Sequence, residues 1–310
     1  MWAALNAALL GRILSIVIPG PDRLVWSLLG AAALQFSEPV WQNLTFGQIN
    51  LVLVWLVLED LGRPRARWWS GLLVGVAAAI KLVPAVFGVV LLARGEWRGV
   101  LRSFAGFLGA TAIGGLVLPT SSRLYWTSLL FDSGRVGNVE YAANQSLAGA
   151  VARWFGPGGS PGVLIVVSLV VAAILAFGLV RVRQEQRWVQ IWITALAGLL
   201  ISPVSWSHHW VWLTPIAVWL CITGEAWAWR TALAIVLVTY SRMIWWAPSR
   251  HGAEYGASVW AKVATDAYTV TAAALLIGLV YVYAVRRPRD KESTPQESEA
   301  PTSTVTRRPG

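Results

Sequence analysis

Four long stretches of this chain carry no charged side chain, and they limit its fold more than any other feature. Each is about as long as the ~20 residues that an α-helix needs to cross ~30 Å of hydrocarbon. With 56% hydrophobic and 13% charged residues, the chain of 310 residues is too apolar to be one water-soluble core. We therefore predict an all-α fold, a polytopic integral membrane helical bundle. The four stretches are 103–122, 161–180, 188–207 and 267–285.

Shorter apolar stretches extend the predicted membrane domain over residues 1–285, with about nine spans in total. The segment 68–93 contains Lys81 and Pro84, and arginines flank it on both sides. Because Pro84 removes a helical N–H and clashes with the preceding turn, we expect two short helices that enter the membrane and return. The additional spans are predicted at 2–18, 23–36, 46–60, 210–223 and 229–246.

The net charge of +10 arises largely from Lys and Arg in short loops between the apolar stretches. Basic residues in such loops indicate the orientation of the spans in the membrane, so we do not expect nucleic acid as a partner. For a multi-pass protein, the positive-inside rule places loops 120–160, 203–209 and 247–263 on the outside. In the last of these loops, Glu254 is expected to be a solvated charge.

The two ends of the chain carry separate expectations. Residues 286–310 are rich in Pro, Ser, Thr and Glu, and they contain too few apolar side chains to offset the entropy of ordering. They are predicted to be a disordered cytoplasmic tail. When the sides of the membrane are alternated span by span from this cytoplasmic tail back to the N-terminus, Met1 is placed outside, although no signal peptide is evident. We therefore expect that an intact relative has at least one further span upstream.

Three polar residues lie at predicted membrane depth. Gln48 and Asn50 open a span with uncharged amides, which suit either a ligand rich in hydroxyl groups or hydrogen bonds between helices. Lys81 is the only lysine at this depth, where an unpaired cation costs at least ~2.5–3.5 kcal/mol. We expect it to face an anionic partner, either a lipid phosphate or a carboxylate. The alternative is that its side chain extends to the nearest interface.

The long outer segment contains no clear span but several groups suited to chemistry. Arg135 can form a bidentate contact with a phosphate, and Asn144 and Gln145 can bind sugar hydroxyls. Asp132 or Glu140 can accept a proton. The alternative is a solvated loop in which these charges pair with one another.

Two of the three histidines, His208 and His209, lie next to Trp206 at a predicted membrane boundary. Adjacent helical residues point about 100° apart, and no Asp, Glu or Cys is near in sequence, so a shared metal is not expected. The single cysteine, Cys221, also excludes a zinc site built from cysteines. One imidazole can donate a hydrogen bond to a phosphate oxygen. The alternative is that these rings anchor the helix end at the interface.

Six motifs with polar residues follow one another along the chain. They are Ser37-Glu38-Pro39, Gly47-Gln48-Ile49-Asn50, Lys81-Leu82-Val83-Pro84, Gly134-Arg135-Val136-Gly137-Asn138, Asn144-Gln145-Ser146-Leu147 and Ser202-Pro203-Val204-Ser205-Trp206-Ser207-His208-His209-Trp210. Taken in order, these motifs resemble glycosyltransferase family 87, the polyprenol-phosphate-mannose-dependent alpha-mannosyltransferases. The resemblance covers most of 37–285. It implies the multi-span GT-C architecture, an active site on the extracytoplasmic side of the plasma membrane, and alpha-1,2-mannosyl linkages on envelope glycolipids and lipoglycans.

The resemblance implies a hexosyltransferase that moves mannose, with inversion, from polyprenyl-phosphate-mannose to a glycolipid or lipoglycan acceptor. The lipid-linked donor is a substrate, and no cofactor or metal is expected. The residues expected to act in catalysis are His208 and His209, with Glu140 or Asp132 as a substitute base. Those expected at the donor phosphate are Lys81, Arg135 and His208. Those expected at the sugar or acceptor are Gln48, Asn50, Asn144, Gln145 and Trp206.

The chain also departs from the family pattern. The acidic residue expected as the base lies upstream of every residue present here, in agreement with the span count. Two alternatives to an active enzyme therefore stay open. One is a catalytically incomplete fragment that binds lipid or partners a complete enzyme. The other is a secondary transporter, because broken helices and an intramembrane lysine also mark transport pathways.

Overall fold

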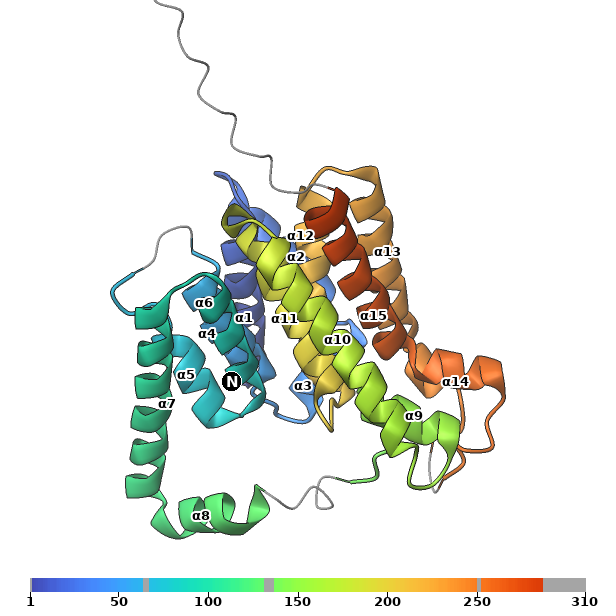
Figure 1. The fold of residues 1–310 in the computed structure, drawn as a ribbon. Helices are drawn as coiled ribbons and strands as arrows, with labels where there is room; N and C mark the ends of the chain where they lie inside the picture. Colours follow the sequence, from blue (N-terminus) through green and yellow to red (C-terminus); the bar gives the residue numbers. More distant parts are fainter. Residues whose placement is uncertain (1, 64–66, 131–136, 250–251, 287–310) are drawn as a thin grey trace, which may run out of the picture.

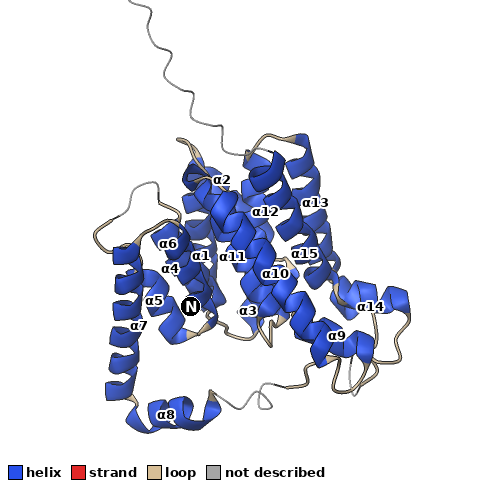
Figure 2. Cartoon of the chain, in the orientation of Figure 1, coloured by secondary structure: helices blue, strands red, loops and turns tan. Residues whose placement is uncertain are grey.

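The structure is a computed structural model that describes residues 2–286 except 64–66, 131–136 and 250–251. These residues form α-helices with short 3-10 and π segments, and no strand occurs among them (Figure 2). The predicted all-α membrane bundle is therefore confirmed. Residues 287–310 of the predicted tail lie outside the described part of the chain.

The helices follow one another with short connections (Figure 1). The N-terminal half contains α1 (Trp2–Val17), α2 (Arg23–Leu34), α3 (Glu38–Thr45), α4 (Asn50–Leu61), α5 (Leu72–Ile80), η1 (Val83–Phe87), α6 (Gly88–Ala93), α7 (Trp97–Val117), α8 (Pro119–Leu124) and η2 (Tyr125–Leu129). The C-terminal half contains α9 (Leu147–Phe155), α10 (Pro161–Arg181), η4 (Gln184–Gln186), α11 (Arg187–Ile201), η5 (Ser207–Trp212), α12 (Leu213–Ile222), α13 (Ala226–Ser241), η6 (Met243–Trp245), α14 (Val259–Thr265), α15 (Ala267–Val280) and η7 (Tyr281–Arg286).

Helix α11 forms the centre of the bundle, where it packs against α10 and α15. Its side chains are mostly apolar on every face and almost all buried, including Trp192, Ile193 and Leu196. A helix that is apolar on every face is stable when every face is covered by other helices. Helix α10 is equally apolar, but Leu169 and Val180 stay exposed on its outer face. Such a face suits contact with lipid.

Within the described part of the chain, three helices are long and apolar enough to cross a membrane, judged by length and composition: Trp97–Val117, Pro161–Arg181 and Ala267–Arg286. A fourth candidate is the pair α3 and α4, which is bent by 118° at the break that carries Gln48. The expected total of about nine spans stays a prediction, because most other apolar stretches form shorter helices. For example, α11 ends at Ile201, before the predicted boundary, because Pro203 disfavours the helical conformation at the preceding Ser202, whose ψ is 136°.

The segment 68–93 breaks at Lys81, as its proline suggested. Helix α5 ends there in extended backbone, with φ −152° and ψ 128° at Lys81, and the short helices η1 and α6 follow. Helix α5 packs closely on α7, and a Cβ atom on Gly75 would overlap the carbonyl group of Ser103. The two ends of the segment meet, because Arg67 and Arg98 line one surface cleft.

The loops divide between the two ends of the bundle. Helices α8, α9 and α14 lie across one end, shown at the bottom of Figure 1. The described parts of the three segments predicted to be outer loops gather at this end. The cleft with Arg67 and Arg98 lies at the connection before α5 and at the connection after α6, toward the other end.

Candidate active site

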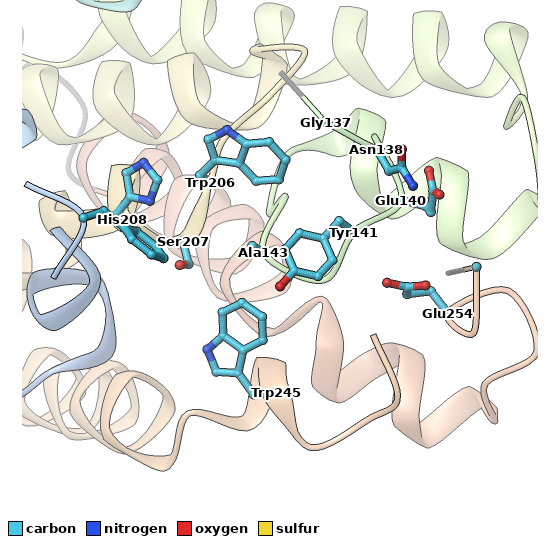
Figure 3. Close-up of a pocket in the computed structure, with 12 residues that line it drawn as sticks. Gly137, Asn138, Glu140, Tyr141, Ala143, Trp206, Ser207, His208, Trp245 and Glu254 are labelled. Carbon is cyan, nitrogen blue, oxygen red and sulfur yellow. The ribbon is translucent and has the colours of Figure 1, made fainter. Parts of the chain in front are cut away.

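A cavity of about 650 Å³ opens at the end of the bundle crossed by α9 and α14 (Figure 3). Its volume lies within the ~300–1,000 Å³ usual for small-molecule sites. Three parts of the chain that are distant in sequence supply nearly all of its wall. The lining residues are Phe46, Gly137, Asn138, Glu140, Tyr141, Ala143, Trp206, Ser207, His208, Trp245, Gly252 and Glu254.

The histidine motif forms one wall of the cavity. After α11 ends, the N–H of Ser205 donates to the side-chain oxygen of Asn144 at 2.9 Å, and the chain then turns into the 3-10 helix η5. His208 lines the cavity and meets the ring of Phe46 edge-on, with the centroids 5.7 Å apart. The plane of His209 is turned 89° from that of His208, and this second ring faces away from the larger cavity. The motif therefore contributes one imidazole to the cavity.

The second imidazole belongs to a polar cluster with Lys81. The ammonium nitrogen of Lys81 lies 2.7 Å from His209 Nε2 and donates to Asn50 Oδ1 at 3.2 Å. Asn50 in turn donates to the backbone carbonyl of His208 at 3.1 Å. No carboxylate of the described chain forms an ion pair with Lys81. The lysine thus meets an amide and an imidazole where an anion was expected.

This cluster lines a second cavity of only about 30 Å³, which has room for water but not for a hexose. Lys81 and His209 lie here, whereas His208 lies in the larger cavity. Burial is the main cause that lowers the pKa of His208 to about 4, and the charge of Lys81 is the second. His208 is therefore a neutral ring near pH 7, able to donate one N–H.

Asn144 and Gln145 do not reach the cavity. Both are completely buried, and backbone groups satisfy their amides. Asn144 donates to the carbonyl of Val139 at 2.9 Å, and Gln145 accepts from the N–H of Tyr268 at 3.0 Å. These amides connect the outer segment to the loop after α11 and to the start of α15. In this structure they hold backbone rather than sugar hydroxyls.

The other wall of the cavity carries acidic and aromatic groups. Glu140 lines it together with Glu254. Tyr255 forms a hydrogen bond with Glu140, and the pKa of Tyr255 is raised by burial first and by the charge of Glu140 second. In Figure 3 both carboxylates lie on the side of the cavity away from His208. The tryptophan singled out from the sequence, Trp206, lies in the wall between these two sides.

Three predicted residues are not part of this constellation. Asp132 and Arg135 lie outside the described residues, so their roles stay predictions. Gln48 is half-buried at the bend between α3 and α4, where its N–H donates to the carbonyl of Asn43. Its neighbour Phe46 lines the cavity in its place.

Sequence reasoning missed several residues that build the site. Glu38 is fully buried and accepts hydrogen bonds from the Tyr268 hydroxyl at 2.8 Å and from the Trp245 indole at 3.1 Å. Arg153 and Asp266 form a buried ion pair. The sequence contained one indication of this pair, because Arg153 and Asp266 are charged residues close to long apolar stretches. It did not indicate that these two residues contact each other.

The described residues contain no group of three or more His, Cys, Asp or Glu that could hold a metal ion. The cavity instead combines aromatic faces, two carboxylates and a neutral imidazole. Aromatic faces with a few placed polar groups suit a small ligand that carries hydroxyl groups. Fold and site together define a helical membrane protein with a cavity at one end of its bundle, lined by aromatic rings and a few polar groups.

Comparison with known proteins gives the family. The model of glycosyltransferase family 87 matches residues 1–203, and the chain belongs to this family. The recognition made from the six motifs is therefore confirmed. No solved structure matches the chain.

Curated relatives come from two mycobacterial species. A polyprenol-phosphate-mannose-dependent alpha-(1-2)-phosphatidylinositol mannoside mannosyltransferase of Mycobacterium tuberculosis is 34% identical over 93% of this chain and 70% of its own length. A protein of the same name from Mycolicibacterium smegmatis is 36% identical over 81% of this chain and 60% of its own length. A phosphatidylinositol pentamannoside mannosyltransferase of Mycolicibacterium smegmatis is 38% identical over 64% of this chain. The match covers 47% of the length of that relative.

Proposed function

We propose that this membrane protein acts as a mannosyltransferase, moving mannose from polyprenyl-phosphate-mannose to a glycolipid acceptor with inversion. Membership of glycosyltransferase family 87 and the names of the mycobacterial relatives support this donor. Those names also support a phosphatidylinositol mannoside as the acceptor class. The observation that carries the proposal is the cavity, with His208 on one side and Glu140 on the other.

The opposed sides of the cavity suit a single displacement. An acceptor hydroxyl attacks the anomeric carbon, its proton passes to a carboxylate, and the carbon–oxygen bond to the lipid phosphate breaks. Inversion requires the attacking oxygen and the leaving phosphate to lie on opposite sides of that carbon. Glu140 would accept the proton on one side. The neutral N–H of His208 would donate to the leaving phosphate on the other side.

Lys81 would act on the phosphate through its neighbours. Its ammonium group bonds His209 and Asn50, and Asn50 holds the backbone of His208. The cluster therefore holds the backbone that carries the His208 ring and adds positive charge behind it. Arg135, which belongs to the outer segment, would add a direct phosphate contact. Trp206 would cover one face of the sugar.

The cavity end of the bundle would face the extracytoplasmic side of the plasma membrane. The Arg-rich connections around α5, α6 and α7 gather away from that end, as the positive-inside rule requires for a cytoplasmic face. Residues 1–285 would form the membrane domain, and the reaction as written needs no cofactor.

The test is transfer of radiolabelled mannose from polyprenyl-phosphate-mannose in membranes that contain the protein. His208→Ala should lower the initial rate on the order of 100-fold, as loss of one donor to a developing charge typically does. Arg183→Ala is the matched control, because Arg183 is exposed and only pairs with Glu185 at 3.5 Å. A His208→Ala protein that transfers mannose at the control rate would exclude this role. If the unchanged protein binds the donor but transfers no mannose, the result would favour the catalytically incomplete fragment.

A further inference from the structure

Glu254 lies in the loop between η6 and α14, where the sequence predicted a solvated charge. That prediction is wrong, because Glu254 is only 3% exposed. Its side chain lines the large cavity, and Figure 3 shows its carboxylate directed inward, on the side where Glu140 lies. A glutamate is rarely buried so deeply unless a partner compensates for the loss of water.

The carboxylate of Glu254 is incompletely satisfied. Its Oε2 atom is buried and has no hydrogen-bond partner among the described residues. A buried acceptor without a donor is costly, and the cost is larger for a charged group. The terminal torsion of a glutamate is broad, so a small rotation can present either oxygen to the cavity. A donor that enters the cavity would therefore remove an existing penalty.

The surroundings indicate which donor fits. Tyr141 and Trp245 contribute aromatic faces close together, with ring centroids 6.0 Å apart. Glu140 is already engaged, since it forms a hydrogen bond with Tyr255. Aromatic faces suit the apolar C–H face of a ring, and a free carboxylate oxygen suits its hydroxyl groups. A hexose presents both.

We propose that Glu254 binds a hydroxyl group of the hexose that occupies this cavity, and so distinguishes a sugar-bearing lipid from its sugar-free form. The inference rests on the proposed function and adds a sugar-contact residue to it. The hexose can belong to the donor or to the acceptor, since both carry the same hydroxyl chemistry. The experiment below separates these two sources.

The test compares affinities of the purified protein for four lipids in detergent. Polyprenyl-phosphate-mannose is paired with polyprenyl phosphate, and phosphatidylinositol mannoside is paired with phosphatidylinositol. Glu254→Gln keeps the shape of the side chain but removes its charge. It should weaken binding of one mannose-bearing lipid by on the order of tenfold and leave both sugar-free lipids unchanged. Glu185→Gln is the matched control, because the Glu185 side chain is 77% exposed.

Each outcome decides a separate point. A loss confined to the donor places the donor sugar at Glu254, and a loss confined to phosphatidylinositol mannoside places the acceptor sugar there. Equal affinities of Glu254→Gln and wild type for all four lipids would overturn the role of Glu254 alone. An equal loss for sugar-free lipids would also overturn it, by showing a structural role. A wild-type protein that prefers neither mannose-bearing lipid would refute the proposed function as well.

Discussion

Two residues that are adjacent in the chain have different surroundings. His208 lines the large cavity, and His209 contacts Lys81 in the small one. The 3-10 turn of η5 separates their side chains by about a third of a revolution, so one motif supplies two cavities. The sequence predicted this divergence but not which ring meets the ligand.

The ionisation of His208 can be tested through its reaction with diethyl pyrocarbonate, which modifies the neutral ring. With a pKa lowered to about 4, His208 stays neutral between about pH 5.5 and 7.5. Its modification rate, followed by mass spectrometry, should be flat over that interval. An unshifted imidazole of pKa ~6.5 would react roughly tenfold more slowly at the lower limit. A midpoint near that value would contradict the burial and the charge that surround His208.

Asn144 should matter more for stability than for sugar binding. Asn144→Ala leaves the N–H of Ser205 and the carbonyl of Val139 without partners, which we expect to cost about 2 kcal/mol or more. Thermal unfolding in detergent measures this loss. Gln48→Ala is the matched control, because Gln48 is half-buried and its side chain forms no hydrogen bond among the described residues. Equal unfolding temperatures of the two variants would refute the expectation.

At the scale of elements, one ion pair fixes the outer segment against the bundle. Arg153 on α9 bonds Asp266, the residue before α15. The same guanidinium donates to the carbonyls of Glu140, Tyr141 and Asn144 at 3.0–3.1 Å. Helix α9 therefore sets the position of the cavity wall that carries Glu140.

Asp266→Asn should loosen this wall. The change leaves the Arg153 charge buried without its counter-charge, which typically costs about 3–5 kcal/mol. We expect a lower unfolding temperature and faster proteolysis within 137–146. Glu185→Gln removes an exposed pair and should change stability by less than about 1 kcal/mol. Unaltered proteolysis in the Asp266→Asn protein would show that the pair does not hold the segment.

Helices α5 and α7 depend on glycine for their close approach. A Cβ atom at Gly75 would overlap the backbone carbonyl of Ser103, whereas a Cβ atom at Gly109 meets nothing within 4 Å. Gly75→Ala should therefore lower the yield of folded protein, with overpacking of at least about 1–3 kcal/mol. Gly109→Ala should be tolerated. Similar size-exclusion profiles and yields for both variants would count against this packing.

At the scale of the whole molecule, sidedness is the next property to test. A background with Cys221→Ser has no cysteine, so single cysteines can be placed on the surface. Arg67→Cys and Arg98→Cys lie in one cleft and should react with a membrane-impermeant maleimide from the same side. Ser121→Cys on α8 should react from the opposite side (Figure 1). Labelling of Arg67→Cys and Arg98→Cys from opposite sides would exclude the re-entrant segment.

Composition and local pattern predicted much of this protein. Charge-free stretches of spanning length required a helical membrane bundle, and Pro84 marked the break next to Lys81. Ordered motifs identified glycosyltransferase family 87. These features are local, because hydropathy, helix length and proline chemistry act within a few turns of the chain. The same local rules overestimated the length of α11. The predicted span ran to residue 207, but Pro203 ends the helix at Ile201.

The tertiary structure decided which polar groups meet. Asn50 lies 158 residues from its partner His208, and Glu38 lies 230 residues from Tyr268. No local pattern encodes such pairs. The sequence around an amide or a carboxylate on a buried helix is the same whether its side chain forms a hydrogen bond with another helix or lines a cavity. Packing therefore assigned Asn144 to the scaffold and directed Glu254 into the cavity, where a buried carboxylate requires a partner.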